Sequence, residues 1–351
     1  MNKTIPSLNG LRAISIFGIL IAHVQIMNFH RADGPGGQIG VSIFFVISGF
    51  LITLLLLKEE AEHGTISLKN FFIRRSLRIF PAFYFLLFVY FLLQMCGVLN
   101  IGLSSWLSSL TYTKFYFARG QNDWETGHIW TLSAEEQFYL IWPFVFVYLK
   151  KLRATFAVVI ILVVPALRLF TDISVMHLFT RADALMLGCL LAMHYQKAVS
   201  FFNTKPVVVL LLPFVMLLFC LFSKKFLFML DAQQAGLISK VFFGSFGSIT
   251  NLSIAAIIIV SITHRNNLYF KVLNNELINY IGKLSYSIYL WQQLFFSKNT
   301  LPLSNFPINL ACILLAALFS YYLIEQPFLK LKKRFVEVQP PILNPVQVTT
   351  G

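Results

Sequence analysis

Arg12 and His23 are the two ionisable residues of the first apolar segment, and they lie 11 residues apart. On an α-helix this spacing is three turns plus about 20°, with a rise of about 16 Å, so both side chains share one face. An ionisable group in a membrane helix is costly and marks a candidate functional site. His23 could act as a base, because a neutral imidazole accepts a proton near pH 7. Two simpler alternatives stay open. Arg12 could be a basic residue at the cytoplasmic end of the helix, and His23 could form a hydrogen bond with a neighbouring helix.

A second group of cations follows the second apolar segment, in the sequence FFIRRSLRIFP. Arg74 and Arg78 are four residues apart, and Arg75 and Arg78 three, so on a helix the three guanidinium groups form one cationic face. Guanidinium groups bind phosphate oxygens through paired hydrogen bonds, which suits a phosphate-rich ligand. Basic clusters beside a membrane also bind anionic lipid headgroups, and this alternative stays open.

Two adjacent carboxylates enter an apolar run in the segment HIWTLSAEEQFYLIWP. Ser133 and Glu136 match the S-x-x-E pattern of a capping box, which would give Glu136 a structural role. Glu135 then has no structural partner, and we predict that it belongs to the site. His128 and Trp130 either support that site or form an interfacial pair, because Trp is enriched at membrane interfaces.

Other polar positions have ordinary structural explanations. Arg181 and Asp183 could form a buried ion pair, and Glu325 could pair with an arginine at the cytoplasmic end of the last apolar segment. The four cysteines are scattered singly, without the spacing of metal ligands, so we expect no metal.

The chain that carries these residues is too apolar for a water-soluble enzyme. Of its 351 residues, 57% are hydrophobic and 12% charged, whereas a soluble domain is about a quarter charged. The net charge of +14 does not indicate nucleic acid, because Lys and Arg occur in short clusters between apolar runs, as membrane topology requires. We predict an all-α, polytopic integral membrane protein in a lipid bilayer.

Apolar runs long enough to cross a bilayer predict about ten transmembrane helices. They cover residues 11–29, 39–57, 79–99, 131–149, 154–170, 176–194, 207–223, 241–262, 277–296 and 306–324. The aromatic segment 106–117 is shorter, and we expect it to be interfacial or re-entrant. With the N-terminus in the cytoplasm, 19 of the 28 basic residues fall in inner segments, which predicts cytoplasmic termini. Residues 1–335 then form the membrane domain, and 336–351 a disordered cytoplasmic tail.

Seven segments, taken in order, resemble the acyltransferase 3 family of bacterial membrane proteins, which includes O-antigen and exopolysaccharide acetylases. They read SLNGLRAISIFGILIAH, IGVSIFFVISGFLI, FFIRRSLRIFPAFY, HIWTLSAEEQFYLIWP, TRADALMLG, IGKLSYSIYLW and LIEQPF. The resemblance covers residues 7–328. It implies an enzyme of the inner (plasma) membrane that takes an acyl group, usually acetyl, from cytoplasmic acyl-CoA to a hydroxyl of a carbohydrate or lipid-linked glycan, such as lipopolysaccharide.

The family motifs fall on residues already singled out. The Arg-x10-His signature matches Arg12 and His23, the Arg-x-x-Arg signature Arg75 and Arg78, and the Ser-x-Glu signature Ser133 and Glu135. Two features depart from the family. The position after YLW, often His, is Gln292, so no proton transfer is assigned there. Larger members carry a soluble extracytoplasmic domain after the last helix, and we expect this chain to lack one. The membrane domain would then complete the transfer itself or pass the acyl group to a separate periplasmic protein.

The physical interpretation and the resemblance agree on a geometry. The polyanionic CoA headgroup would dock on the four arginines at positions 12, 74, 75 and 78, and the thioester would follow the first helix towards His23. We expect His23 to be the general base and Glu135 to orient it; direct attack and a transient acyl-enzyme both stay open. A transporter or flippase accounts for the intramembrane charges equally well, and a scaffold subunit is a third alternative. The glycan, the hydroxyl and the acyl group are not specified by the sequence.

Overall fold

The computed structural model describes residues 5–29, 35–117, 124–171, 177–205, 207, 210–219, 236–265, 267–297 and 305–335. Every regular element in these ranges is a helix, which confirms the all-α prediction. The predicted tail, residues 336–351, lies outside the described ranges.

Nine longer helices make up most of the described structure. They are α1 (Leu8–Phe29), α2 (Pro35–His63), α3 (Leu68–Met95), α7 (Ile129–Tyr148), α8 (Arg153–Phe170), α9 (Ala182–Met193), α12 (Gly236–Thr263), α14 (Glu276–Phe295) and α15 (Ile308–Phe319). The shorter elements are α4 (Leu103–Leu110), α5 (Lys114–Phe117), α6 (Trp124–Gly127), η1 (Leu178–Thr180), α10 (Tyr195–Asn203), α13 (Leu268–Leu273), η3 (Ser320–Glu325), α16 (Gln326–Lys332) and η4 (Lys333–Phe335).

Six segments of the described chain are long and apolar enough to cross a membrane, so the chain has the character of a multi-pass membrane protein. They are Leu8–Ile26, Gly36–His63, Leu68–Met95, Arg153–Phe170, Phe246–Thr263 and Ile308–Phe335. The pair α9 and α10, bent by 80°, would make a seventh. The prediction of about ten is confirmed only in part. Helices α7 and α14 are 20 residues long but are not among these segments, and both carry polar residues of the candidate site.

The aromatic segment 106–117 forms α4 and α5, two helices too short to cross a bilayer. Its location at an interface stays a prediction, as does the cytoplasmic location of the termini.

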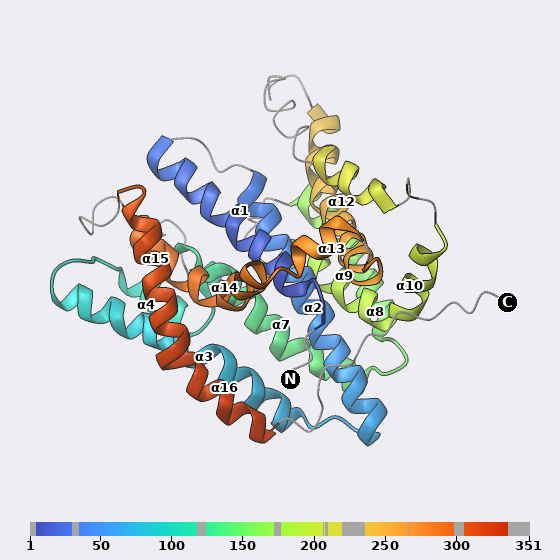
Figure 1. Cartoon of the computed structure of the whole chain (residues 1–351), viewed down its shortest axis with the longest axis horizontal. Coiled ribbons are helices and arrows are strands. Elements are labelled where there is room, and N and C mark those ends of the chain that lie inside the picture. Colours follow the sequence, from blue (N-terminus) through green and yellow to red (C-terminus); the bar gives the residue numbers. More distant parts are fainter. Residues whose placement is uncertain are drawn as a thin grey trace.

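Helix α2 runs through the middle of the molecule, beside α1 (Figure 1). Two glycines allow α2 and α9 to pack backbone to backbone. A Cβ atom on Gly49 would lie 1.9 Å from the carbonyl oxygen of Leu185, and one on Gly188 would lie 2.1 Å from that of Val46. Small residues permit this close approach in membrane helices.

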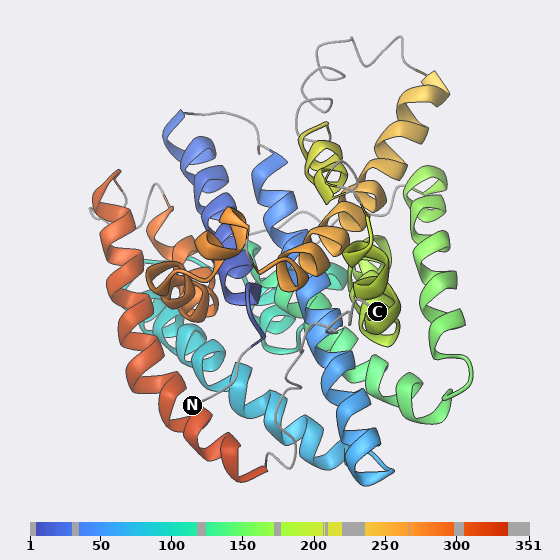
Figure 2. The same cartoon turned by 45° about the vertical axis from the view of Figure 1, so that its right-hand side comes forward.

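Helix α1 packs between α2 and α14. At this contact a Cβ atom on Gly282 of α14 would lie 2.0 Å from the carbonyl oxygen of Asn9. Helices α15 and α16 border α14 and α3, whereas α8 and α12 lie beyond α9 on the other side of the molecule (Figures 1 and 2). Between α15 and α16, η3 is a π-helical turn, a feature frequent at functional sites.

The predicted ion pair between Arg181 and Asp183 is wrong. The fully buried carboxylate of Asp183 instead accepts hydrogen bonds from Arg168 Nη2 and Ser248 Oγ, both at 2.7 Å. The Arg181 guanidinium lies over the Trp130 ring, 5.9 Å from its centroid. Residues two apart at the start of a helix point in different directions, so Asp183 pairs with α8 and α12 rather than with its neighbour.

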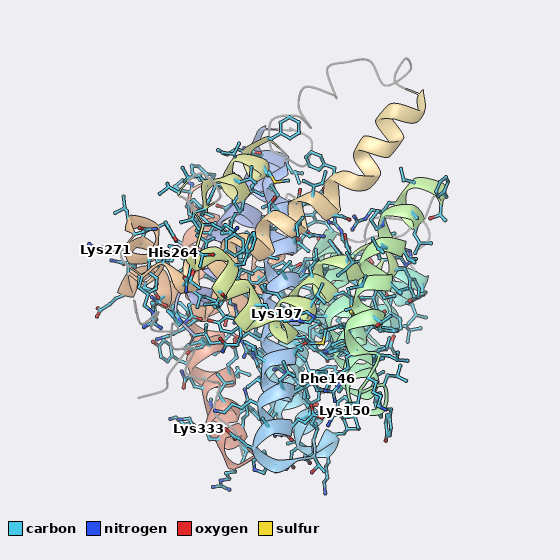
Figure 3. All side chains as sticks on the ribbon, turned by 90° about the vertical axis from the view of Figure 1, so that its right-hand side faces the viewer. Phe146, Lys150, Lys197, His264, Lys271 and Lys333 are labelled. Carbon is cyan, nitrogen blue, oxygen red and sulfur yellow. The ribbon has the colours of Figure 1, made fainter. Side chains whose placement is uncertain are left out.

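A second ionic contact fixes the C-terminal end of α2. Both oxygens of Glu60 bind Arg153, at 2.7 and 3.0 Å, and Lys150 Nζ lies 2.7 Å from the same carboxylate. Figure 3 shows Lys150 and Lys333 at the same end of the molecule. The last turn of the described chain contacts the N-terminal part of α3, where Arg74 Nη1 donates a hydrogen bond to the carbonyl oxygen of Phe335 at 3.0 Å.

Candidate functional site

A cavity of about 340 Å³ lies between α1, α2, α3, α7 and α14. Its volume is within the range of sites for small molecules. Its charged lining consists of Arg12, Arg74, Arg75, Arg78, Lys332, Glu59 and Glu135. We call it the cationic cavity. The structure therefore brings Arg12 together with the three arginines of the FFIRRSLRIFP segment.

The arginines of the cationic cavity differ in how far their charge is compensated. Arg74 Nη2 lies 2.6 Å from Glu59 Oε2. Arg12 lies over the ring of Phe44 at 5.9 Å, and Arg75 over that of Tyr139 at 5.4 Å. Three of the arginines, at positions 12, 75 and 78, have no carboxylate within ion-pair distance in the described part of the chain. Charges buried without a counterion are costly, so this lining favours a polyanionic ligand.

The cationic face forms because α3 begins well before the predicted span 79–99. Ser67 caps the helix by accepting a hydrogen bond from the backbone N–H of Asn70 at 3.3 Å. The backbone N–H of Ser67 in turn donates to Glu59 Oε1 at 2.8 Å, which joins the start of α3 to α2. The arginines therefore lie within a regular helix, at the spacing that places them on one face.

Glu135 lines the cationic cavity and accepts a hydrogen bond from Ser48 Oγ at 2.7 Å. We expected Glu135 to orient His23, but its hydrogen-bond partner Ser48 lies on α2, and its carboxylate lies in the cavity with the arginines. Its place in the site is thus beside the anion-binding groups, and its catalytic role stays a prediction.

The predicted capping box at the start of α7 is wrong. The helix begins at Ile129, four residues before Ser133, because the apolar residues after His128 continue the helix without a break. Ser133 Oγ instead donates back to the carbonyl oxygen of Ile129 at 3.1 Å, as Ser does inside helices. Glu136 Oε1 is buried and has no hydrogen-bond partner among the described residues, so the cap does not explain this carboxylate.

His23 lies at the other end of α1 and does not line the cationic cavity. Its Nδ1 lies 3.1 Å from Gln292 Oε1, and its ring contacts those of Trp124 and Phe296 at 5.8 and 5.9 Å. A tautomer of His23 with its proton on Nδ1 would donate to this amide oxygen, and Nε2 would then be the basic atom. Gln292, to which the sequence assigned no proton transfer, is the residue that orients the imidazole.

A chain of polar contacts leads from the cationic cavity towards His23. Tyr289 and Thr131 line the cationic cavity. The Tyr289 hydroxyl donates to the carbonyl oxygen of His128 at 2.8 Å and accepts from Thr131 Oγ1 at 2.7 Å. The His128 ring packs against Tyr289 at 5.5 Å and lies close enough to His23 for the two imidazoles to interact electrostatically.

Comparison with known proteins assigns the chain to a family. The model of the acyltransferase domain family (Acyl_transf_3) matches residues 5–325, nearly the whole chain. The chain belongs to this acyltransferase family. No solved structure matches it.

The chain is also similar to curated proteins. Both proteins below are from Staphylococcus aureus. The chain is 31% identical over 367 residues to the protein named "Putative O-acetyltransferase SACOL0978" of strain COL, and 30% identical over 360 residues to "O-acetyltransferase OatA" of strain NCTC 8325. Each match covers 93% of this chain and 58% of the relative, so the chain spans little more than half the length of these relatives.

The family motifs thus fall on both ends of the site, but the sequence did not predict several lining residues of this acyltransferase as site residues. Ser48 and Tyr289 lie within the segments IGVSIFFVISGFLI and IGKLSYSIYLW, where a Ser or a Tyr in an apolar helix has an ordinary packing role, and Lys332 was considered only for topology. Glu325 lies at the end of η3 and accepts a hydrogen bond from Ser287, so its partner is not the arginine that we expected. Trp130 packs edge-on against Phe45 at 6.2 Å.

Proposed function

We propose that this acyltransferase is a membrane-bound O-acyltransferase that transfers an acetyl group from cytoplasmic acetyl-CoA to a hydroxyl of a cell-surface carbohydrate. The acceptor would be an O-antigen, an exopolysaccharide, a lipopolysaccharide or a related glycan at the inner membrane. A separate periplasmic protein could take the acetyl group onward.

The observation that carries this proposal is the arrangement along α1. Arg12 lies in a cavity with three further arginines, which suits the phosphates of CoA. His23 lies about 16 Å further along the same helix, with its Nδ1 held by Gln292. Family membership and the O-acetyltransferase names of the relatives support the same chemistry.

In the proposed reaction, His23 is the base that activates the acceptor hydroxyl. His23 Nε2 takes the proton of the acceptor hydroxyl while the oxygen of that hydroxyl attacks the thioester carbonyl. The C–S bond breaks, CoA leaves as a thiolate that takes up a proton, and the sugar keeps the acetyl ester. Glu135 would help to set the charge of the cavity in which the donor binds.

The test uses the purified protein in lipid nanodiscs with acetyl-CoA. The acceptor is the surface polysaccharide of the producing strain, stripped of its esters with mild alkali. We expect release of the free thiol of CoA and gain of acetyl on the polysaccharide by mass spectrometry. A transporter or flippase would release no thiol, and that result would refute the enzyme.

The matched control is a second histidine. His264 bonds to Thr263 Oγ1 at 2.8 Å and does not line the cationic cavity. His23→Ala should abolish acetyl transfer at a normal protein level, whereas His264→Ala should not. Equal activity of both variants would exclude His23 as the base.

A further inference from the structure

We propose that Trp124 and Gln293 form the acceptor subsite, where one sugar unit of the glycan binds beside His23. This inference rests on the proposed function, which leaves the acceptor without a place on the protein.

The first observation is a concentration of buried polar atoms without a protein partner. In the described residues these include Trp124 Nε1, Gln292 Nε2 and Gln293 Oε1, whereas the His128 ring lies near the backbone of Glu125 and Leu290. Gln292 is 0% exposed and Gln293 3%. Buried polar groups are nearly always hydrogen-bonded, so several unpaired ones in one region indicate a ligand that completes them.

The second observation is that two of these residues contact His23 and the third lies beside them. Trp124 packs against the His23 ring at 5.8 Å, and Gln292 binds His23 Nδ1. A Cβ atom on Gly127 would lie 3.9 Å from Gln293 Nε2, so Gln293 lies against α6, the helix that carries Trp124.

The short helix α6 is held firmly in this position. Ser297 Oγ donates to Glu125 Oε1 at 2.9 Å, which ties α6 to the end of α14. Tyr90 of α3 donates to the carbonyl oxygen of Glu125 at 3.1 Å, and Lys114 Nζ donates to Thr126 Oγ1 at 2.6 Å. Binding groups held by such contacts are preorganised, which reduces the entropy lost when a ligand binds.

The chemistry of the group matches a sugar. The indole N–H and the amide NH₂ are donors, the amide oxygen is an acceptor, and an imidazole can serve as either. Sugar hydroxyls likewise donate and accept, and the C–H face of a pyranose ring packs on aromatic rings such as Trp124 and Phe296. These amide, indole and imidazole groups suit a neutral hydroxyl better than a phosphate, in contrast to the cationic cavity.

Two substitutions test the subsite, Trp124→Phe and Gln293→Leu. Each removes an unpartnered polar atom and keeps much of the shape, so the melting temperature should stay equal or rise. The KM for the alkali-treated polysaccharide should rise roughly three- to tenfold, the effect of one lost hydrogen bond. The KM for acetyl-CoA, which binds in the cationic cavity, should change by less.

The matched control is another tryptophan whose N–H is already used. Trp106 Nε1 donates to Gln94 Oε1 at 2.8 Å. Trp106→Phe should therefore lower the melting temperature and leave the KM for the polysaccharide unchanged. As an independent readout, the polysaccharide should raise the melting temperature of the wild type more than that of Trp124→Phe.

Different failures have different meanings. If the wild type transfers acetyl and both Trp124→Phe and Gln293→Leu keep its KM for the polysaccharide, the buried atoms hold only water and the subsite is overturned. If the wild type transfers no acetyl at all, the proposed function fails and the subsite falls with it.

Discussion

Arg78 offers the sharpest test of the cationic cavity, because it lines the cavity and has no carboxylate partner in the described chain. Arg74 is the matched control. It lies one turn earlier on the same helix, but its guanidinium is already engaged by Glu59 at 2.6 Å. We therefore compare Arg78→Gln with Arg74→Gln.

The structure gives opposite expectations for the two variants. Loss of one charge-assisted hydrogen bond to phosphate costs about 1.5–3 kcal/mol, and about 1.4 kcal/mol corresponds to a tenfold change in Kd. Arg78→Gln should thus weaken acetyl-CoA binding by roughly 10- to 150-fold with little loss of stability. Arg74→Gln leaves the buried Glu59 without its counterion, so its main effect should be a lower melting temperature.

The assay is equilibrium binding of radiolabelled acetyl-CoA to protein in nanodiscs of uncharged lipid. Without anionic headgroups, any effect of Arg78 on affinity comes from the CoA ligand itself. The affinity of the wild type should also fall as salt is raised, because part of the attraction is electrostatic. The melting temperature of each variant is measured in the same nanodiscs.

An unchanged affinity of Arg78→Gln in uncharged lipid would refute the reasoning. It would mean that the arginines serve anionic lipids, as basic clusters near a membrane often do. If Arg74→Gln lost as much affinity for acetyl-CoA as Arg78→Gln, Arg74 would bind the ligand in spite of its ion pair with Glu59.

Four further predictions address other parts of the molecule. His23→Ala should lower acetyl transfer by about 10²- to 10⁴-fold with the Kd for acetyl-CoA unchanged, and an unaltered rate would contradict the base. Glu135→Gln removes a negative charge from the cationic cavity, so acetyl-CoA should bind more tightly while transfer slows; weaker binding in the same assay would contradict this. Arg168→Met should destabilise the protein by about 3–5 kcal/mol in thermal unfolding, because Asp183 loses its partner, and adding Asp183→Leu should restore much of that; an unchanged stability would show that the pair is not needed. Gly49→Ala should prevent close packing of α2 on α9 and leave little folded protein in the membrane, and a normal protein level would argue against that contact.

The residues of the cationic cavity were predictable because helical periodicity is a local property. Arg75 and Arg78 share a face whatever the rest of the fold does, and the same holds for Arg12 and His23 on α1. The ends of helices were harder. The S-x-x-E pattern also occurs inside helices, and at Ser133 nothing in the neighbouring residues stops the helix from beginning earlier at Ile129.

Partners far apart in the sequence could not be read from it. Gln292 lies 269 residues from His23, and Asp183 pairs with Arg168 across two helices. Any buried carboxylate can be satisfied by any arginine that the packing brings near it, so the nearest arginine in sequence was the wrong choice. The span count is confirmed only in part for a related reason. Helices that line a polar site carry polar residues, and those residues make α7 and α14 look less like membrane spans.

In the proposed function the donor binds at the Arg12 end of α1 and the acceptor at the His23 end, so the acyl group must travel along this helix. Tyr289 lines the cationic cavity and packs against the His128 ring, and its hydroxyl is held by the carbonyl oxygen of His128 and by Thr131. Each hydrogen bond contributes about 0.5–1.5 kcal/mol, so breaking both costs about 1–3 kcal/mol. This is small beside the barrier of about 16 kcal/mol for a typical turnover of 10 per second. The two hydrogen bonds of Tyr289 are therefore weak enough to break and re-form within a single turnover.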